Sequence, residues 1–302
     1  GKWTVIFSNT PVSQISNVVV SIIFDGLAYA MILFIISVGL SVTMGLMGFV
    51  NLAHGVFAMA GGYFMTSLMS QIGVPFIPAL LLAAIAVGIV SVVFERVFYA
   101  PLYKAGELDQ VLLCIGLVFM ATASFTYVFG PDPVTIKVPE ELRGQLDLGF
   151  RRFPTYRVFM IGTGLLMALG IWYGFEKTMI GARVRAAVDN PMMAQSVGIN
   201  VDRLFRFTFA LGSGLAALGG GLAVDILGLS PSFAIQYLVL FLIVVAVGGL
   251  GTIKGAFVAA LILGVIDNGG KYLWPEGGAF FIYVIAIVVL LLRPNGLYGR
   301  HG

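Results

Sequence analysis

The sequence predicts an all-α fold, a polytopic transmembrane helix bundle of roughly eight to ten spans in which some helices are broken at glycine. Apolar residues make up 59% of the 302 positions and charged residues only 10%, whereas a soluble domain carries about a quarter of charged residues. No charged residue occurs between Asp25 and Glu95. That stretch holds several crossings, because one helix needs about 20 apolar residues to cross a bilayer. The apolar runs are continuous rather than alternating, which favours helices over a β-barrel. This composition excludes soluble enzymes, disulfide scaffolds, disordered chains and nucleic-acid binders.

The apolar runs divide the chain, a single domain over 1–302, into nine segments. The first segment is long enough for one tilted helix or for a helix followed by a broken piece. Two long loops interrupt the series, an external one at about 131–155 with four prolines and a second one at about 176–203. In chain order, we expect spans at 16–48, 51–71, 75–98, 110–130, 156–175, 204–228, 234–250, 254–270 and 278–293.

Basic residues orient the bundle, because cytoplasmic loops carry an excess of Lys and Arg. If the loop after residue 175 is cytoplasmic, alternation of the spans places ten basic residues inside and seven outside. The inside set is Arg96, Lys104, Lys177, Arg183, Arg185, Arg203, Arg206, Lys254, Arg293 and Arg300. The outside set is Lys2, Lys137, Arg143, Arg151, Arg152, Arg157 and Lys271. We therefore expect the N-terminus outside, the C-terminus inside, and no cleavable signal peptide within residues 1–14.

The loop 176–203 has the pattern of a short amphipathic helix. Asp189 or Asn190 can cap a helix that starts at Pro191 and ends at Gly198, because Asn and Asp are preferred N-caps, proline suits the first turn and glycine ends helices. Its apolar face consists of Met192, Met193, Ala194 and Val197, and Asn200 or Asp202 can cap the next span. Such a helix on the basic side suits docking of a cytoplasmic partner. The alternative is a helix that lies passively at the lipid headgroups.

Small residues recur every fourth position in two of the expected spans, at Gly212, Ala216 and Gly220 and at Ala256, Ala260 and Gly264. Small residues at this spacing form one stripe on a helix and let a neighbouring helix approach closely. We interpret both stripes as ordinary bundle packing.

Two glycine-rich stretches, 45–55 and 248–257, place polar groups at membrane depth, one in each half of the chain. Paired glycine-interrupted segments surround the pathway in internally repeated transporters. The residues that we expect to line or brace a translocation pathway are Asn51, His54, Gly55, Gly249 and Gly251. For His54 the alternative is that it satisfies a neighbouring helix. Asp225, a lone carboxylate near the external end of its span, is either part of an outer gate or a solvated interfacial side chain.

Several kinds of chemistry are absent from the sequence. The stretch around Lys271 lacks the upstream glycine and the hydroxyl residue of a phosphate-binding loop, so the chain does not hydrolyse ATP itself. His54 and His301 are the only histidines and make no metal cluster. No nucleophile elbow occurs, and the single cysteine, Cys114, is a small packing residue. We expect no enzyme activity, no metal and no cofactor bound by this chain.

Four motifs in order along residues 20–300 resemble the branched-chain amino acid ABC transporter permeases, most closely the LivH-like branch. The loop motif resembles the coupling loop of that family, 183–200 being Arg-x-Arg-Ala-Ala-x-Asp-Asn-x-x-x-Ala-x-x-x-Gly-Ile-Asn. Residues 50–55 resemble its Asn-Phe-Ala-His-Gly segment, residues 248–256 its Gly-Gly-x-Gly-Ser-x-x-Gly-Ala segment, and residues 294–299 its Pro-x-Gly-Leu-x-Gly ending. Leu52, Lys254 and Asp225 depart from the family pattern, which leaves urea, amides and aromatic acids open as substrates.

The resemblance implies a transmembrane permease subunit of an ABC importer in the bacterial inner membrane, most simply for branched-chain amino acids. Its partners would be a second homologous permease, two cytoplasmic ATPases that carry ATP and Mg²⁺, and a periplasmic substrate-binding protein. ATP-driven closure of the ATPases would push the coupling helix and switch access between the two faces. Ala194 would lie against the ATPase. The coupling residues would be Arg183, Arg185, Ala187, Asp189, Asn190, Pro191, Met193, Ala194, Val197 and Gly198.

The main alternative is a secondary transporter driven by an ion gradient. Such a protein needs ionisable residues inside its spans, and the candidates are Asp25, Asp225 and Asp267. Asp225 and Asp267 lie close to glycines at the ends of their spans, so we expect both to be interfacial rather than part of a proton relay.

Overall fold

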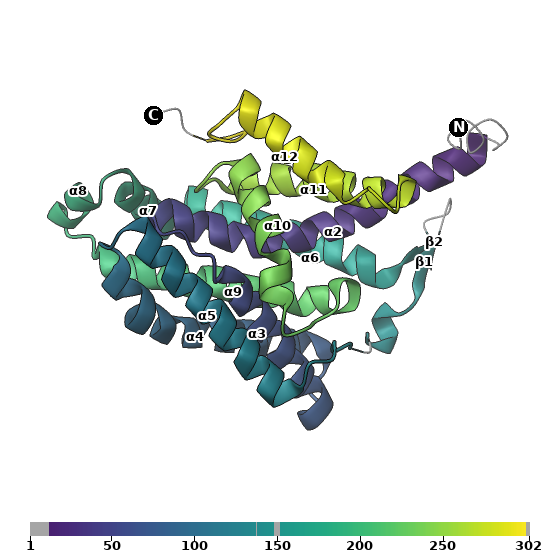
Figure 1. The fold of residues 1–302 in the computed structure, drawn as a ribbon, viewed down its shortest axis with the longest axis horizontal. Helices are drawn as coiled ribbons and strands as arrows, with labels where there is room; N and C mark the ends of the chain where they lie inside the picture. The colour runs from purple at the N-terminus through teal and green to yellow at the C-terminus, as the bar shows by residue number, and fades with distance from the viewer. Residues whose placement is uncertain (1–11, 137, 148–151, 300–302) are drawn as a thin grey trace.

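The computed structural model describes residues 12–136, 138–147 and 152–299, and it confirms the all-α bundle (Figure 1). The helices are α2 (Val12–Met47), α3 (His54–Ser67), α4 (Phe76–Phe94), α5 (Glu107–Phe129), α6 (Thr155–Lys177), α7 (Met179–Asp189), α8 (Pro191–Ser196), α9 (Val201–Leu227), α10 (Phe233–Gly248), α11 (Ile253–Leu273) and α12 (Phe280–Leu292). Shorter turns are the π-helical η1 (Leu68–Ile72) and η2 (Glu95–Tyr99) and the 3₁₀ turns η3 (Ala100–Leu102) and η4 (Glu140–Leu142). One antiparallel hairpin pairs β1 (Gln145–Asp147) with β2 (Arg152–Pro154).

Every expected span corresponds to a helix in the described part of the chain. Six helices are long and apolar enough to cross a membrane by themselves. The shorter ones are α3, α10 and α12, and α3 continues through η1. With 13 residues, α12 is about 20 Å long at 1.5 Å per residue, which is less than a hydrocarbon core of about 30 Å. The bundle is therefore polytopic, with some helices that cross only together with their non-helical flanks.

The two ends of the bundle differ in character. One end, here called the α7–α8 end, carries those two helices, and the opposite end, the hairpin end, carries β1 and β2 (Figure 1). Among the described residues, the basic residues predicted inside lie toward the α7–α8 end, and those predicted outside lie toward the hairpin end. Four members of the two sets lie outside the described residues and are Lys2, Lys137, Arg151 and Arg300. His301 and residues 1–11 lie outside the described residues too.

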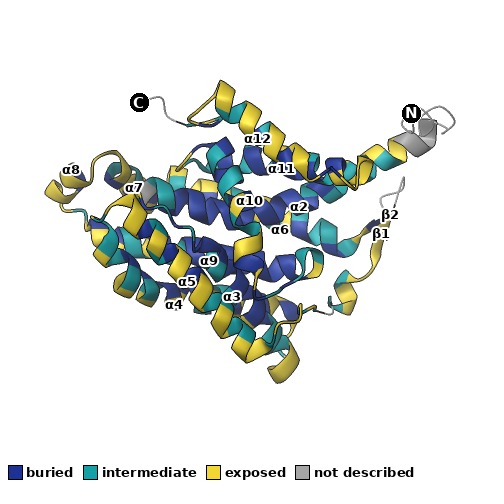
Figure 2. Ribbon diagram, in the orientation of Figure 1, coloured by how far each residue is buried: buried dark blue, intermediate teal, exposed yellow. Residues whose placement is uncertain are grey.

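Helix α2 forms the centre of the bundle. It packs against α11, α9 and α6, and nearly all of its residues from Ala28 to Thr43 are fully buried. Figure 2 shows this buried stretch between the other helices, whereas the outward faces of α4, α5 and α12 are exposed. The exposed side chains on these outer helices are large and apolar, Ile89 at 65%, Phe119 at 62% and Leu291 at 79%. A surface of that kind suits lipid.

Both small-residue stripes lie at helix crossings, as the sequence predicts. A Cβ on Gly212 would be 2.9 Å from the carbonyl oxygen of Gly39 in α2, and a Cβ on Gly264 would be 2.7 Å from Cα of Ala30. Gly220 meets the backbone of Ala58 in α3 in the same way. Close backbone approach increases the dispersion contacts on which packing in a membrane depends.

Substitution of glycine at a crossing tests this packing. We expect Gly220→Ala to lower the free energy of unfolding by about 1–3 kcal/mol, because the new methyl group would overlap the backbone of α3. Gly116→Ala is the matched control, since that helical glycine in α5 has nothing within 4 Å of a Cβ. The control should be neutral or stabilising by up to about 1 kcal/mol. The measurement is thermal unfolding of both purified variants in detergent, and equal midpoints would contradict the crossing geometry.

Candidate functional site

The α7–α8 end begins with a tight turn between α6 and α7. Thr178 is the N-cap of α7, and its Oγ1 accepts a hydrogen bond from the backbone N of Gly181 at 3.2 Å. Arg185 donates from its guanidinium to the carbonyl oxygen of Phe175 near the end of α6. The sequence analysis did not single out α7. The run of alanine, arginine and valine after a threonine cap is the signal that could have found it.

The short helix predicted after residue 189 is present as α8. Asn190 is its cap and accepts from the backbone N of Met193 at 3.0 Å through Oδ1, and Pro191 lies in its first turn. Gly198 follows the helix with φ +85°, and Asn200 caps α9 by accepting from the backbone N of Arg203 at 3.0 Å. Of the alternative caps, Asn190 and Asn200 serve and the neighbouring aspartates do not.

A small core of its own attaches α7 and α8 to the bundle. This α7–α8 core consists of Val184, Ala187, Ala194, Val201 and Leu204, and it packs against Met47 and Phe175. The expectation that Ala194 lies against a partner is wrong, because its side chain is 3% exposed within this chain, and Ala187 of the predicted coupling set is fully buried as well. Their small size allows the close packing of α7, α8 and α9. A large side chain at either position would break the α7–α8 core before it could report on a partner.

The opposite face of α8 is apolar and uncovered. The exposed fractions of Met192, Met193 and Val197 are 79%, 66% and 75%. Arg183 and Asp189 are exposed on α7. The apolar face of α8 and the exposed charges of α7 therefore lie on one projecting element, whereas Arg185 is half-buried and turned back toward α6.

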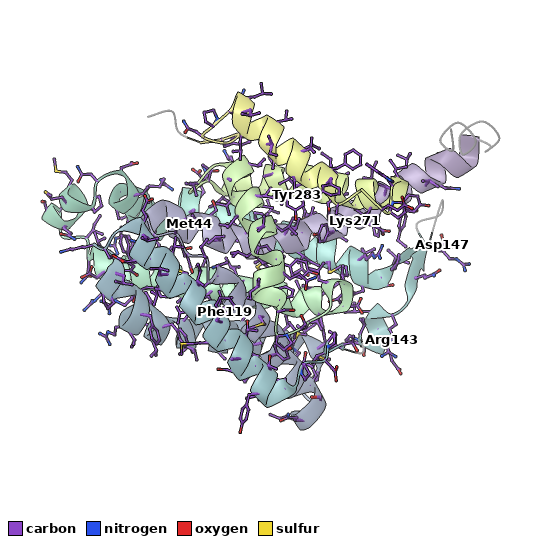
Figure 3. All side chains as sticks on the ribbon, in the orientation of Figure 1. Met44, Phe119, Arg143, Asp147, Lys271 and Tyr283 are labelled. Carbon is purple, nitrogen blue, oxygen red and sulfur yellow. The ribbon has the colours of Figure 1, made fainter. Side chains whose placement is uncertain are left out.

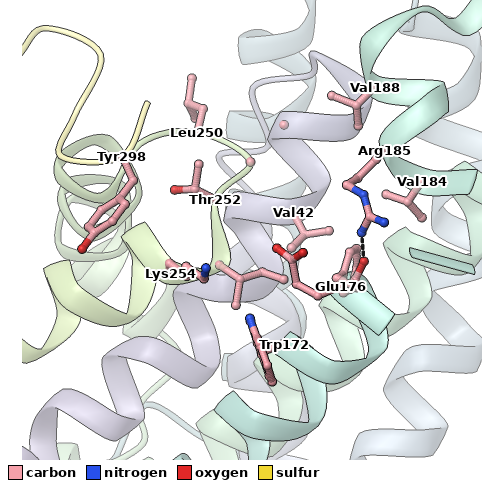
Figure 4. Close-up of a pocket in the computed structure, with 14 residues that line it drawn as sticks. Val42, Trp172, Glu176, Val184, Arg185, Val188, Leu250, Thr252, Lys254 and Tyr298 are labelled. Carbon is pink, nitrogen blue, oxygen red and sulfur yellow. Dashed lines mark hydrogen bonds between the residues drawn. The ribbon is translucent and has the colours of Figure 1, made fainter. Parts of the chain in front are cut away.

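A cavity of about 360 Å³ lies where α2, α6, α7 and the turn before α11 meet (Figure 4). Its lining combines opposite charges with apolar walls, and Figure 4 shows the polar atoms of Trp172, Glu176 and Lys254 turned toward the same space. Gly251 lines it. Thr252 is held at its edge, since its Oγ1 donates to the carbonyl oxygen of Gly249 at 2.7 Å.

The two glycine-rich stretches of the sequence lie against each other beside this cavity. Gly251 donates its backbone N–H to the carbonyl oxygen of Ser41 at 3.1 Å, and a Cβ on Gly251 would be 3.2 Å from Cα of Gly45. Gly249, with φ +100°, leaves room for Gly299, whose backbone N would be 2.5 Å from a Cβ there. The C-terminal segment continues this contact, as Leu297 donates to the carbonyl oxygen of Val247 at 2.7 Å. Gly249 and Gly251 thus shape the turn between α10 and α11.

Asn51 and His54 brace the break between α2 and α3. Helix α2 ends at Met47, and Gly48 has φ +61°, so the predicted broken helix is present. His54 donates from Nε2 to the carbonyl oxygen of Ile36 at 3.0 Å, and Asn51 accepts at Oδ1 from the hydroxyl of Tyr99 at 3.0 Å.

Both residues are almost fully buried, at 2% and 1% exposure, and no described cavity is lined by either. Gly55 packs against the backbone of Ala234 in α10. Of the two predicted roles, the structure supports bracing, because non-helical backbone at membrane depth must find its partners inside the protein.

Two carboxylates at the hairpin end, Asp225 and Asp267, differ in burial. Asp225 is exposed in the last turn of α9 and lies within electrostatic range of Arg157. Asp267 is buried at 2% exposure and accepts from Nζ of Lys271 at 2.6 Å. Asp267 is therefore shielded within the bundle, at the hairpin end of α11.

Another buried carboxylate, Glu95, escaped the sequence analysis. It lies in the π-helical turn η2, is 2% exposed, and accepts at Oε1 from the hydroxyl of Tyr103 at 2.5 Å. Among the residues that the structure describes, no group of three or more His, Cys, Asp or Glu side chains could hold a metal ion.

Glycine-broken apolar helices, a capped helix pair at one end and polar clusters at the other define a multi-pass membrane transport permease. The chain belongs to the family of permease components of branched-chain amino acid transport systems, which matches residues 22–290. The resemblance seen in the motifs is thereby confirmed.

Relatives match almost from end to end. The chain is 28% identical to the high-affinity branched-chain amino acid transport permease LivH of Escherichia coli K12 over 92% of this chain and 94% of that one. It is 26% identical to BraD, the corresponding permease of Pseudomonas aeruginosa, over 91% and 94%. It is 25% identical to a probable LivH of Methanocaldococcus jannaschii over 92% of each. Among solved structures, PsaBC from Streptococcus pneumoniae in complex with Fab shares the fold, with a TM-score of 0.50 and 16% identity over 89% of each chain.

The bracing role of Asn51 predicts a loss of stability. We expect Asn51→Ala to lower the free energy of unfolding by about 1–3 kcal/mol, because the buried Tyr99 hydroxyl loses its acceptor. Tyr99→Phe in the same protein should restore part of the loss, since it removes the unpaired hydroxyl. Thermal unfolding in detergent measures both, with Gln236→Ala on the exposed face of α10 as the control. Unchanged stability together with reduced uptake would favour the pathway role instead.

Proposed function

We propose that this chain is the transmembrane permease subunit of an ATP-driven ABC importer in the bacterial inner membrane. The observation that carries the proposal is the projecting helix α8, capped at its start and apolar on its uncovered face, in a chain of this family. The α7–α8 end is then cytoplasmic and the hairpin end faces outward. The excess of Lys and Arg at the α7–α8 end supports that orientation.

Two cytoplasmic ATPases are the proposed partners at the α7–α8 end. Three exposed apolar side chains in one helix would be unfavourable in water, and Met is well suited to fill an irregular groove. Met192, Met193 and Val197 would supply the buried apolar part of the interface with the ATPase, and Arg183 would mainly increase the rate of association. ATP and Mg²⁺ would bind on the ATPases and not on this chain. A second homologous permease would complete the membrane part, and a periplasmic binding protein would deliver the solute at the hairpin end.

The α7–α8 core gives a physical route from that contact to the bundle. It packs against Met47 at the end of α2, Phe175 near the end of α6, and the first turns of α9. Tightly packed elements of this kind move as a unit rather than deform. A push on α8 would therefore displace the ends of three long helices together, which is the kind of rigid-body movement that switches access between two faces.

The proposed solute is a branched-chain amino acid. Family membership supports it, as do the relatives with that named substrate. Reconstitution in liposomes with the partner permease, the ATPases and the binding protein tests it. We expect uptake of leucine, isoleucine or valine that requires ATP inside and is insensitive to ionophores. Uptake that needs an ion gradient and no ATP would establish the secondary-transporter alternative, and uptake of urea, amides or aromatic acids alone would replace the solute.

The exposed methionines give a sharper test of the ATPase contact. We expect the double variant Met192→Ser, Met193→Ser to weaken ATPase binding by about ten- to a hundredfold, the range expected when apolar hot-spot side chains are lost. Met179→Ser is the matched control, because Met179 is 71% exposed at the other end of the α7–α8 pair. Co-purification of the ATPases and solute-stimulated hydrolysis measure the effect. Equal retention in both variants would show that α8 is not the docking element.

A further inference from the structure

The hairpin end contains a pocket that mixes charges of both signs. It is a cavity of about 190 Å³ formed by α2, α6, α11 and the adjoining ends of α9 and α10. Asp25 and Tyr29 contribute from α2, Arg157 from α6, and Asp267 and Lys271 from α11. Figure 3 shows Lys271 on the side of the bundle toward Asp147, whereas Met44 lies toward α7 and α8. The pocket is therefore at the end where the solute would arrive.

The floor of the pocket is built to hold an ammonium group. Asp267 is 2% exposed, and Tyr29 lines the same pocket within electrostatic range of its carboxylate. The ammonium of Lys271 lies 2.6 Å from Oδ2 of Asp267 and 5.8 Å from the centre of the Tyr29 ring. A buried carboxylate beside an aromatic face is a strong seat for a cation.

Only the terminal ammonium group of Lys271 reaches into this cation-binding site. Its side chain is 53% exposed, whereas that of Asp267 is 3% exposed. The two residues are neighbours on the same helix at i and i+4, so their ion pair links no two helices. An ion pair that stabilises the bundle would join two different helices. Here the buried Asp267 carboxylate is instead covered by the Lys271 ammonium, and the long side chain of Lys271 can extend into water.

The mouth of the pocket offers a second, opposite group. Arg157 forms an ion pair with Asp25, and each side chain is 34% exposed. A guanidinium has five donors in a planar fork that matches a carboxylate. The four charges Asp25, Arg157, Asp267 and Lys271 sum to zero, so a ligand with one positive and one negative group binds without leaving any of them uncompensated.

We propose that this pocket binds the α-amino acid itself, as a zwitterion, while it passes through the permease; the inference rests on the proposed function. The α-ammonium displaces Lys271 from Asp267 and Tyr29, and the α-carboxylate binds Arg157 and the released Lys271. Ile226 and Leu227 provide an apolar wall for the side chain of the solute. The volume suits a solute much smaller than a drug-sized ligand, whose pockets hold about 300–1,000 Å³.

The same geometry separates the candidate solutes. Urea and neutral amides carry no ammonium with which to displace Lys271, and an aromatic acid without an amino group leaves the pair of Lys271 and Asp267 in place. A buried group made to pair with a charge rejects a ligand that lacks it far more strongly than an apolar wall rejects a missing methyl group. The pocket therefore selects for both charged ends of an amino acid.

Protection from chemical labelling tests binding directly. Ile226→Cys, in the complex with the partner permease and ATPases, provides a thiol in the pocket wall, and the native Cys114 is fully buried. We expect L-valine at ten times its dissociation constant to slow maleimide labelling by about tenfold. The 2-oxo acid of valine, which lacks the ammonium, should not protect. Gln236→Cys, exposed outside the pocket, should label at one rate throughout. Equal labelling of Ile226→Cys with and without valine, or equal protection by the oxo acid, would overturn the proposal.

Variants of Asp267 and Lys271 show whether this ion pair forms a binding site for the solute or serves only the stability of the bundle. Asp267→Asn should abolish protection and lower valine uptake by about tenfold or more, as expected for loss of a charge-assisted contact. Asp267→Asn combined with Lys271→Gln removes both members of the ion pair, so uptake would recover if the pair served only structure, whereas the loss of a binding site for the α-ammonium would persist. Asp147→Asn is the control, since Asp147 pairs with Arg152 at 3.4 Å on the exposed hairpin at the same end.

The two failures are distinguishable. If the wild-type complex takes up no amino acid with ATP, the proposed function fails. If the wild type takes up valine and Asp267→Asn matches it in uptake and in protection, or the double variant recovers both, the pocket proposal alone fails.

Discussion

The structure depends on one constraint, that backbone N–H and C=O groups at membrane depth must find hydrogen-bond partners inside the protein. At the break between α2 and α3 and at the turn before α11, specific hydrogen bonds hold the non-helical backbone in place. Asn51 accepts from Tyr99, His54 donates to Ile36, and the turn before α11 donates to the end of α2. The apolar surface then needs no further specification, because lipid accepts it. The polar contacts therefore fix which helices are neighbours, and the glycines fix how closely they approach.

The same constraint distributes roles along the molecule. The breaks in the middle of the bundle are held by hydrogen bonds within the chain. The two ends keep groups that are not fully covered, the apolar face of α8 at one end and the mixed-charge pocket at the other. Helix α2 connects both ends, since its first half contributes Asp25 and its last residue packs into the α7–α8 core. In the proposed cycle, the buried stretch of this helix from Ala28 to Thr43 transmits displacement between them with little loss, because packed interiors are hardly compressible.

The sequence predicted the parts of the fold that depend on local pattern. The apolar runs located the helices, Gly48 marked the break after α2, and Asn190, Pro191 and Gly198 bounded α8. The sequence did not predict which face of a helix is covered. Ala194 was expected to lie against a partner and Asp267 at the membrane interface, and the structure shows that both side chains are buried within the chain. Burial at these positions is decided by helices distant in sequence, α9 for Ala194 and α2 for Asp267, and no local pattern contains that information.

The close approach of Gly45 and Gly251 has a consequence for how such sequences can change. The two residues lie in opposite halves of the chain, and there is no space for a Cβ on Gly45 beside Gly251. A substitution at one position is then tolerated only if the other segment moves, which would also disturb the contact with the C-terminal segment. We therefore expect the three motifs that form this cluster to change together, and a chimera that takes one of them from a distant relative to need all three.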